Sequence, residues 1–341
     1  DGTKAKAAAW FERLYQKWGV DGIKEDTMMK MGSAHIDIFN DPVARIAEEG
    51  DLVMARCGSF SSQGTLLRIN DTQGVKNMSK RTPINYLQYA ACGEPNVYSD
   101  TIGFREMESY SDAIVRHAWM MAMTAGLSVG ESPFHWSEKQ QELFRNPIDF
   151  HYRLAPYMYD AAAKTYLSGF PFTMTPMGIA CPEDKQAMET PHFQWMVGES
   201  LLAAPLVQNH KSGKMDIYLP AGVWFDYDTG KRYQGPKLLQ NFAMPRDKTP
   251  AFVGGRGILV LREAEDNPLR AKFYPLERKD PRFTFYYPDG ESKSEFLIKT
   301  VKSDPSVTEQ QSGRVIQYEK DTASGAISFP IEPGKAYRVS L

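Results

Sequence analysis

The 341-residue chain has an ordinary globular composition, with 42% hydrophobic residues, 12% aromatic residues and a formal net charge of −2. This near-neutral balance gives no electrostatic reason to expect a nucleic acid or an anionic membrane as partner. The three cysteines, Cys57, Cys92 and Cys181, do not have the spacing of a disulfide framework or a zinc site, and no apolar run approaches the ~18 residues of a membrane span.

The first 170 residues alternate helix-like and strand-like segments. The helical patterns are 4–18, which Gly19 ends, 42–50, 84–93, 110–126 and 144–169. The strand-like runs between them are 22–26, 52–58, 65–71, 96–100 and 126–132. Repeated strand–helix units predict a parallel sheet covered by helices.

After residue 170 the sequence pattern changes. Pro and Gly there separate short apolar runs such as LLAAPLV, GILVLR and RFTFYYP. Short strands at this spacing indicate a β-sandwich. A gap near residues 266–272 divides them into two successive modules. We therefore expect domains at 1–170, 171–265 and 266–341.

Polar residues end all five strand-like runs of the first part. They are Lys24 and Asp26, Arg56, Asn70 and Asp71, Ser99 and Asp100, and the stretch 128–131. If these runs are consecutive strands of an α/β barrel, the polar ends meet at the catalytic mouth. For any single residue, a cap, a turn or a surface ion pair is an equally ordinary role.

Two carboxyl groups that flank the scissile bond are the catalytic residues of most glycoside hydrolases, and several of these strand ends carry a carboxyl group. Side chains alternate along a strand, so Lys24 and Asp26 share one face. A cation this close lowers the pKa of the carboxyl and keeps it ionised, as a covalent nucleophile requires. Asp71, from a different strand end, is the candidate acid/base.

Several motifs together resemble glycoside hydrolase family 31, the family of α-glucosidases and α-xylosidases. GVDGIKED is similar to the nucleophile strand of the family, RCGSFSSQ to its arginine segment and SDTIGF to a sugar-binding strand end. INDT stands where the family has its acid/base loop. YRLAPYMYDAAAKTYLSGFPF and IYLPAGVWFDYDTGKRYQG resemble the last barrel helix and the following sandwich. The resemblance covers roughly residues 10 to 265.

The resemblance implies a role for each matched residue. Asp26 matches the nucleophile and Asp71 the general acid/base, while Arg56 and Asp100 match positions that bond sugar hydroxyls. Lys24 matches a lysine of the α-xylosidase-like members. The implied enzyme is a retaining, exo-acting α-glycosidase that needs neither cofactor nor metal. The implied fold is α/β: the second half of a (β/α)8 TIM barrel followed by two all-β sandwich domains.

Departures from the family pattern cluster around the expected sugar pocket, at 27–29, Arg68, Phe104 and Val129. They put glucose in doubt as the glycone and bring galactose, N-acetylgalactosamine or xylose into consideration. They also keep a second hypothesis open, a catalytically silent relative that binds carbohydrate or serves as a subunit. A related α-galactosidase-type barrel is a third option, although the sandwich motifs disfavour it.

The family barrel also has strands before the nucleophile strand. We therefore expect an N-terminal half, in the same polypeptide or in a separate chain, as partner besides an oligosaccharide or glycoside. The compartment stays open, with a secreted or periplasmic location favoured. Trp10 and Trp18 are interpreted as packing residues. Trp119 and Trp136 are the aromatic candidates for a pocket rim, with core packing as the alternative.

Overall fold

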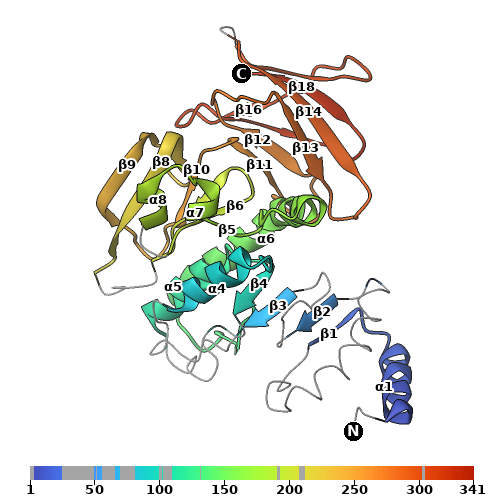
Figure 1. Ribbon diagram of the computed structural model, residues 1–341. Helices are drawn as coiled ribbons and strands as arrows, with labels where there is room; N and C mark the ends of the chain where they lie inside the picture. Colours follow the sequence, from blue (N-terminus) through green and yellow to red (C-terminus); the bar gives the residue numbers. More distant parts are fainter. Residues whose placement is uncertain are drawn as a thin grey trace.

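The computed structural model of the protein describes residues 4–24, 50, 52–55, 66–69, 81–99, 102, 110–130, 132–189, 193–206, 212–301 and 304–341 (Figure 1). Within these stretches, no helix combines the length and the apolar character that crossing a membrane requires. A parallel sheet with helices occupies the N-terminal part, and three antiparallel or mixed sheets follow it.

The N-terminal sheet contains four parallel strands in sequence order. They are β1 (Gly22–Lys24), β2 (Leu52–Ala55), β3 (Leu66–Ile69) and β4 (Val97–Ser99). A fifth predicted strand is reduced to an isolated parallel bridge between Ile102 and Val129. The prediction of consecutive parallel strands is therefore confirmed for this part. The described strands form an open sheet, so a barrel is only partly present.

Helix α1 (Ala5–Trp18) precedes the sheet and ends as the sequence predicts. Gly19 adopts a left-handed conformation with φ 59°, and its N–H donates to the Gln16 carbonyl. Trp10 and Trp18 are 58% and 61% exposed, however, and only Tyr15 on this helix is a buried aromatic of known placement. Trp10 and Trp18 therefore do not pack within the described structure, and the packing role expected for them stays a prediction.

Three further helices make the layer between the parallel sheet and the β modules (Figure 1). They are α4 (Arg81–Ala91), α5 (Asp112–Met121) and α6 (Glu138–Ser168). Helix α6 starts earlier than the pattern predicts, because Ser137 and Gln140 form a capping box ahead of it. Its 31 residues run on through Pro147 and Pro156 to Gly169. One hydrophobic core joins α4, α5 and α6 to the next sheet.

A six-stranded sheet follows, with the order β5-β6-β7-β10-β8-β9. Its strands are β5 (Thr175–Pro176), β6 (Trp195–Val197), β7 (Leu201–Ala203), β8 (Lys214–Asp226), β9 (Arg232–Ala243) and β10 (Ala251–Val253). The residues of strand β7 show that this six-stranded sheet is covered on both faces. Leu201 and Ala203 belong to the core beside α6, while Leu202 belongs to the core beneath α7 (Met177–Ala180) and α8 (Lys185–Glu189).

The C-terminal part is a sandwich of two four-stranded sheets, as the short strands predict. One sheet has β11 (Ile258–Leu261), β12 (Arg270–Phe273), β17 (Ile327–Pro330) and β16 (Glu319–Lys320). The other has β13 (Arg282–Tyr286), β14 (Lys293–Lys299), β18 (Ala336–Ser340) and β15 (Ser306–Glu309). An aromatic core of Phe273, Phe296, Phe329 and Tyr337 lies between them. Strand β11 pairs with β12, across the gap in the sequence pattern.

Candidate functional site

The parallel pairing brings the carboxyl ends of β1 to β4 to one edge of the sheet. Lys24 is in register with Met54, and Ile69 is in register with Ser99 at the ends of β3 and β4. Lys24 is exposed at the end of β1. This is the edge at which an α/β barrel builds its active site.

The other predicted site residues, Asp26, Arg56, Asp71 and Asp100, lie outside the described residues. In the sequence each follows one of the four strand ends by one or two positions. Their roles, and the separation of about 5–5.5 Å expected between the carboxyls of a retaining pair, stay predictions. The departures at 27–29 and Phe104 also lie outside, whereas Val129 is half-buried in the bridge to Ile102.

Sulfur and aromatic contacts hold the described strands in place behind this edge. The Tyr98 hydroxyl on β4 donates to the Met54 sulfur on β2, at 3.3 Å. The buried Tyr86 hydroxyl on α4 donates to the Met121 sulfur on α5, also at 3.3 Å. The Tyr98–Met54 contact crosses the face of β3, which lies between β2 and β4, and so ties these strands together.

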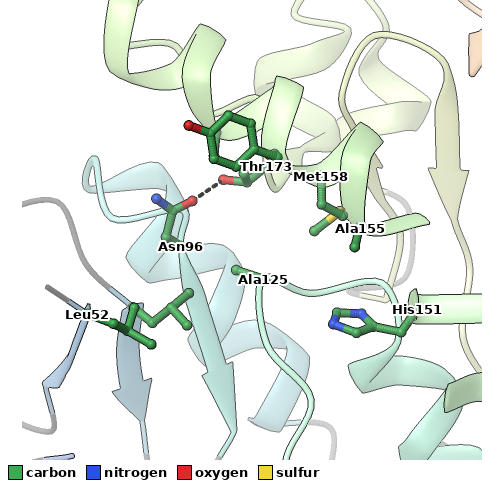
Figure 2. Close-up of a pocket in the computed structure, with 10 residues that line it drawn as sticks. Leu52, Asn96, Ala125, His151, Ala155, Met158 and Thr173 are labelled. Carbon is green, nitrogen blue, oxygen red and sulfur yellow. Dashed lines mark hydrogen bonds between the residues drawn. The ribbon is translucent and has the colours of Figure 1, made fainter. Parts of the chain in front are cut away.

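A cavity of about 240 Å³ lies at the opposite edge of the sheet (Figure 2). Leu52, Leu66 and Asn96 line it from the starts of β2, β3 and β4, and α6 closes it with His151 and Met158. Thr173 donates to the Asn96 side chain at 2.8 Å. Burial lowers the pKa of His151, so its imidazole is neutral near pH 7. Among the described residues that line this cavity there is no carboxylate.

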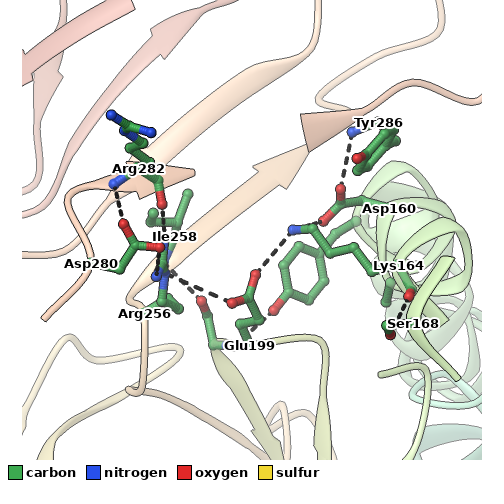
Figure 3. A network of polar contacts seen from close by, with 12 residues as sticks. Asp160, Lys164, Ser168, Glu199, Arg256, Ile258, Asp280, Arg282 and Tyr286 are labelled. Carbon is green, nitrogen blue, oxygen red and sulfur yellow. Dashed lines mark hydrogen bonds and ion pairs between the residues drawn. The ribbon is translucent and has the colours of Figure 1, made fainter. Parts of the chain in front are cut away.

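A network of ion pairs joins α6 to the β modules (Figure 3). The Lys164 ammonium contacts Asp160 at 2.8 Å and Glu199 at 3.0 Å, and it lies 4.1 Å from the Phe283 ring centroid. Arg256 connects Glu199 to Asp280. Each carboxylate in this network has a basic partner, and the network joins α6 to the turn that carries Glu199 and to β13. The network is therefore structural.

Known proteins resemble the chain in its C-terminal part and in its whole fold. Residues 169–259 match the glycosyl hydrolase family 31 C-terminal domain. A 1,6-alpha-glucosyltransferase of Sporosarcina globispora is 30% identical over 168 residues, which are 47% of this chain and 13% of that protein. An alpha-xylosidase of Saccharolobus solfataricus is 26% identical over 223 residues, covering 60% of this chain and 29% of that one.

The solved structure of a family 31 dextranase of Flavobacterium johnsoniae superposes with a TM-score of 0.74 at 18% identity. It covers 98% of this chain and 54% of the dextranase chain. In its C-terminal domain and in its fold, the chain is therefore similar to glycoside hydrolase family 31. It spans less than a third of the two curated family 31 relatives described here and about half of the dextranase.

Both tryptophans considered for a pocket rim are buried in this chain. Trp119 donates its indole N–H to the Arg246 carbonyl at 2.8 Å and packs against Phe150. Trp136 packs edge-on against Tyr110 and Phe144. Their burial favours the packing role for both.

Sequence reasoning missed the ion-pair network, although part of its signal is local. Asp160 and Lys164 stand four residues apart on a helix, the spacing of a side-chain pair. Glu199 and Arg256 come from distant turns, and nothing in the pattern connects them. Among the described residues, no three His, Cys, Asp or Glu side chains cluster as metal ligands would.

Proposed function

We propose that the chain is the C-terminal part of a retaining, exo-acting α-glycosidase that hydrolyses terminal α-linked sugars. In this proposal residues 1–170 form the second half of a (β/α)8 barrel, and 171–265 and 266–341 form the proximal and distal sandwich domains. Strand β11 (Ile258–Leu261) nevertheless pairs with β12, so it belongs to the distal sandwich. The observation that carries it is the parallel order β1-β2-β3-β4, whose carboxyl ends share the edge that precedes Asp26, Arg56, Asp71 and Asp100 in the sequence.

The proposed mechanism has two displacements at the anomeric carbon. Asp26 attacks this carbon while Asp71 gives its proton to the departing glycosidic oxygen, so a covalent glycosyl-enzyme forms as the glycosidic bond breaks. Asp71, now a carboxylate, takes a proton from water, whose oxygen attacks the same carbon and releases Asp26. Lys24 keeps Asp26 ionised, and Arg56 and Asp100 bond the sugar hydroxyls.

The glycone is to be determined by experiment, because the relatives are named for different activities. They include a glucosyltransferase, a xylosidase and a dextranase. An aryl α-glycoside panel of glucose, galactose, N-acetylgalactosamine and xylose identifies the sugar. Adding a sugar acceptor to the same assays measures transfer against hydrolysis.

An N-terminal half of the enzyme, in the same polypeptide or as a second chain, is part of the proposal. Its support is the edge position of β1 in the described sheet, the exposure of Trp10 and Trp18, and the share of the dextranase that this chain covers. These features fit the additional strands and helices that a closed barrel requires.

Substitution of the two carboxyls tests the mechanism. Asp26→Asn removes the nucleophile, so turnover of every aryl α-glycoside falls to background, whereas Asp21→Asn, an exposed position just before β1, leaves it unchanged. Asp71→Asn lowers the rate by about 10²–10⁴-fold for a poor leaving group and much less for dinitrophenol, which departs without a proton.

The silent-relative hypothesis gives a different result in the same assays. A chain that only binds carbohydrate has no turnover in its unsubstituted form, and Asp26→Asn then leaves sugar binding intact. Full activity of Asp26→Asn would remove the nucleophile assignment. A slow fluorosugar substrate adds a direct measurement, because a retaining enzyme gains the mass of one sugar on the peptide that contains Asp26.

A further inference from the structure

A second cavity, of about 400 Å³, lies between α6, the turn after β8 and the sheet β11-β12-β17-β16. This volume is within the range of about 300–1,000 Å³ typical of small-molecule sites. Its walls come from a helix and two β modules, and none of its lining residues belongs to the parallel sheet. It is thus separate from the strand ends where the catalytic carboxyls are proposed.

Part of the cavity wall is fixed by paired charges. The Arg270 guanidinium donates to the Ser328 hydroxyl and carbonyl, both at 3.0 Å, and pairs with Glu319 at 3.1 Å. Lys272 pairs with Asp321 at 3.2 Å. Groups held in this way keep their geometry without a ligand, which reduces the entropy lost on binding.

Other polar groups of the cavity have no protein partner of their own. Within the described part of the chain, no side-chain hydrogen bond or ion pair engages Arg153 or Lys320. The Tyr227 hydroxyl likewise has no hydrogen-bond partner among the described residues, while its ring is fixed edge-on against Phe150 at 5.2 Å. Arg153 is near enough to Tyr227 for its charge to lower the pKa of that hydroxyl against the larger, opposite effect of burial.

The charges around the cavity cancel, which decides what kind of ligand fits. The basic side chains are Arg153, Arg270, Lys272 and Lys320. The acidic side chains are Asp228, Glu263, Glu319 and Asp321. A lining with four of each sign has no net attraction for an anion or a cation, but it presents many donors and acceptors close together.

We propose that this cavity is a second carbohydrate-binding site, which takes one neutral sugar unit of a glycan. Each sugar hydroxyl both donates and accepts, so it bonds to a guanidinium or ammonium on one side and to a carboxylate on the other. The unpartnered groups, Arg153, Tyr227 and Lys320, make the new contacts. The choice of a carbohydrate as the ligand rests on the proposed function, whereas the position of the site does not.

Binding of isomaltotriose, followed by saturation-transfer NMR with the full-length protein, tests this site. Arg153→Ala and Tyr227→Phe each weaken the binding signal at least fivefold, because each removes an unpartnered donor. Arg145→Ala is the matched control, an exposed arginine on the same helix that does not line this cavity. The backbone bond from the Arg262 N–H to the Arg153 carbonyl survives in Arg153→Ala, and thermal unfolding checks that both variants fold.

Hydrolysis of an aryl α-glycoside is measured on the same variants. Unchanged hydrolysis with weakened binding supports a second site. Loss of binding and hydrolysis together in folded Arg153→Ala places the cavity in the active site and overturns the inference, as does unchanged binding or no binding by the unsubstituted protein. If binding depends on Arg153 but no glycoside is hydrolysed, the inference stands and the proposed enzymatic function falls.

Discussion

Tyr157 connects α6 to the turn between β6 and β7 through a single buried hydroxyl. This hydroxyl donates to the Val197 carbonyl at 3.0 Å and accepts from the Ser200 N–H at 2.9 Å. Tyr157→Phe removes both of these buried bonds, so it lowers the free energy of unfolding by about 1–3 kcal/mol. Urea unfolding measures the loss.

Tyr166 provides the control for that substitution, because it lies on the same helix and is 88% exposed. Tyr166→Phe changes the free energy of unfolding by no more than about 0.5 kcal/mol. Equal effects of the two substitutions would mean that the Tyr157 hydroxyl does not join these elements.

Asp160 gives the stability of the molecule a dependence on pH. Burial raises the pKa of Asp160 to about 6, against the opposing effects of the Lys164 ammonium and the Tyr286 N–H. The folded state therefore holds a proton that the unfolded carboxyl, with its ordinary pKa near 3.8, has already lost. This contribution to stability is present at low pH and is lost as pH rises through about 6.

Thermal unfolding of Asp160→Asn at a series of pH values checks this. The asparagine does not titrate, so the advantage of the unsubstituted protein over Asp160→Asn shrinks as pH rises from about 3.8 to about 6, by an amount on the order of 1–3 kcal/mol. An advantage that grows over this range would mean that Asp160 is charged throughout and stabilised by Lys164.

Single residues were predictable from the sequence where their role is local. Gly19 ends α1 because a left-handed residue suits glycine, and this is visible in the pattern. The roles of Trp10 and Trp119 depend on what covers them in three dimensions. The two have the same apolar character, yet one is exposed and the other is fixed by a bond to the Arg246 carbonyl from a distant loop.

At the scale of elements, β8 and β9 form a long hairpin whose pairing is interrupted. Their register shifts between Met215 and Ile217 and between Leu219 and Gly222. Gly235 on β9 passes so close to β8 that a β-carbon there would collide with the Pro220 carbonyl oxygen. The strands can approach in this way only without a side chain at this position.

Gly235→Ala therefore lowers the free energy of unfolding by about 1–3 kcal/mol, as overpacking does. Gly178→Ala in α7 is the matched change, because its β-carbon would meet the Met188 side chain at an ordinary 3.4 Å and alanine favours the helix. Chemical denaturation compares them. A Gly235→Ala protein as stable as Gly178→Ala would show that the hairpin shifts to admit the methyl group.

The hairpin also shows where element prediction fails. The runs 215–220 and 223–228 read as two strands, since Pro220 and Gly222 punctuate them, yet β8 continues through both. Strand β9 has no matching apolar run, because most of its residues face solvent and Gly235 and Pro236 interrupt it. The apolar helix α5 needs no such context, and the sequence predicts its presence, although α5 ends at Met121 and not at residue 126.

At the scale of the whole molecule, the succession of parallel strands followed by a sandwich was predictable from the sequence. The alternation of strand and helix patterns fixes the parallel order, and the Pro- and Gly-punctuated runs fix the sandwich. The packing of α6 against both β modules could not be predicted from the sequence. It depends on contacts between distant segments, such as the bond that the Arg262 N–H donates to the Arg153 carbonyl. The arrangement of the catalytic carboxyls stays a prediction.

The edge strand β1 gives a whole-molecule test of the proposed N-terminal half. Among the described strands β1 pairs only with β2. In an enzyme that includes the preceding barrel strands, a further strand pairs with the other edge of β1. We expect the amides of residues 22–24 to exchange hydrogen at least tenfold more slowly in the full-length enzyme than in the 341-residue chain alone.

Strand β14 is the internal control for this exchange experiment, because β13 and β18 pair with its two edges. Its amides exchange equally slowly in both proteins if the sandwich folds independently of the N-terminal half. Protection confined to β1 and its neighbours then indicates closure of the sheet by added strands. Equal exchange of β1 in the two proteins would contradict a barrel completed at this edge, and with it the placement of Asp26 in the middle of a barrel wall.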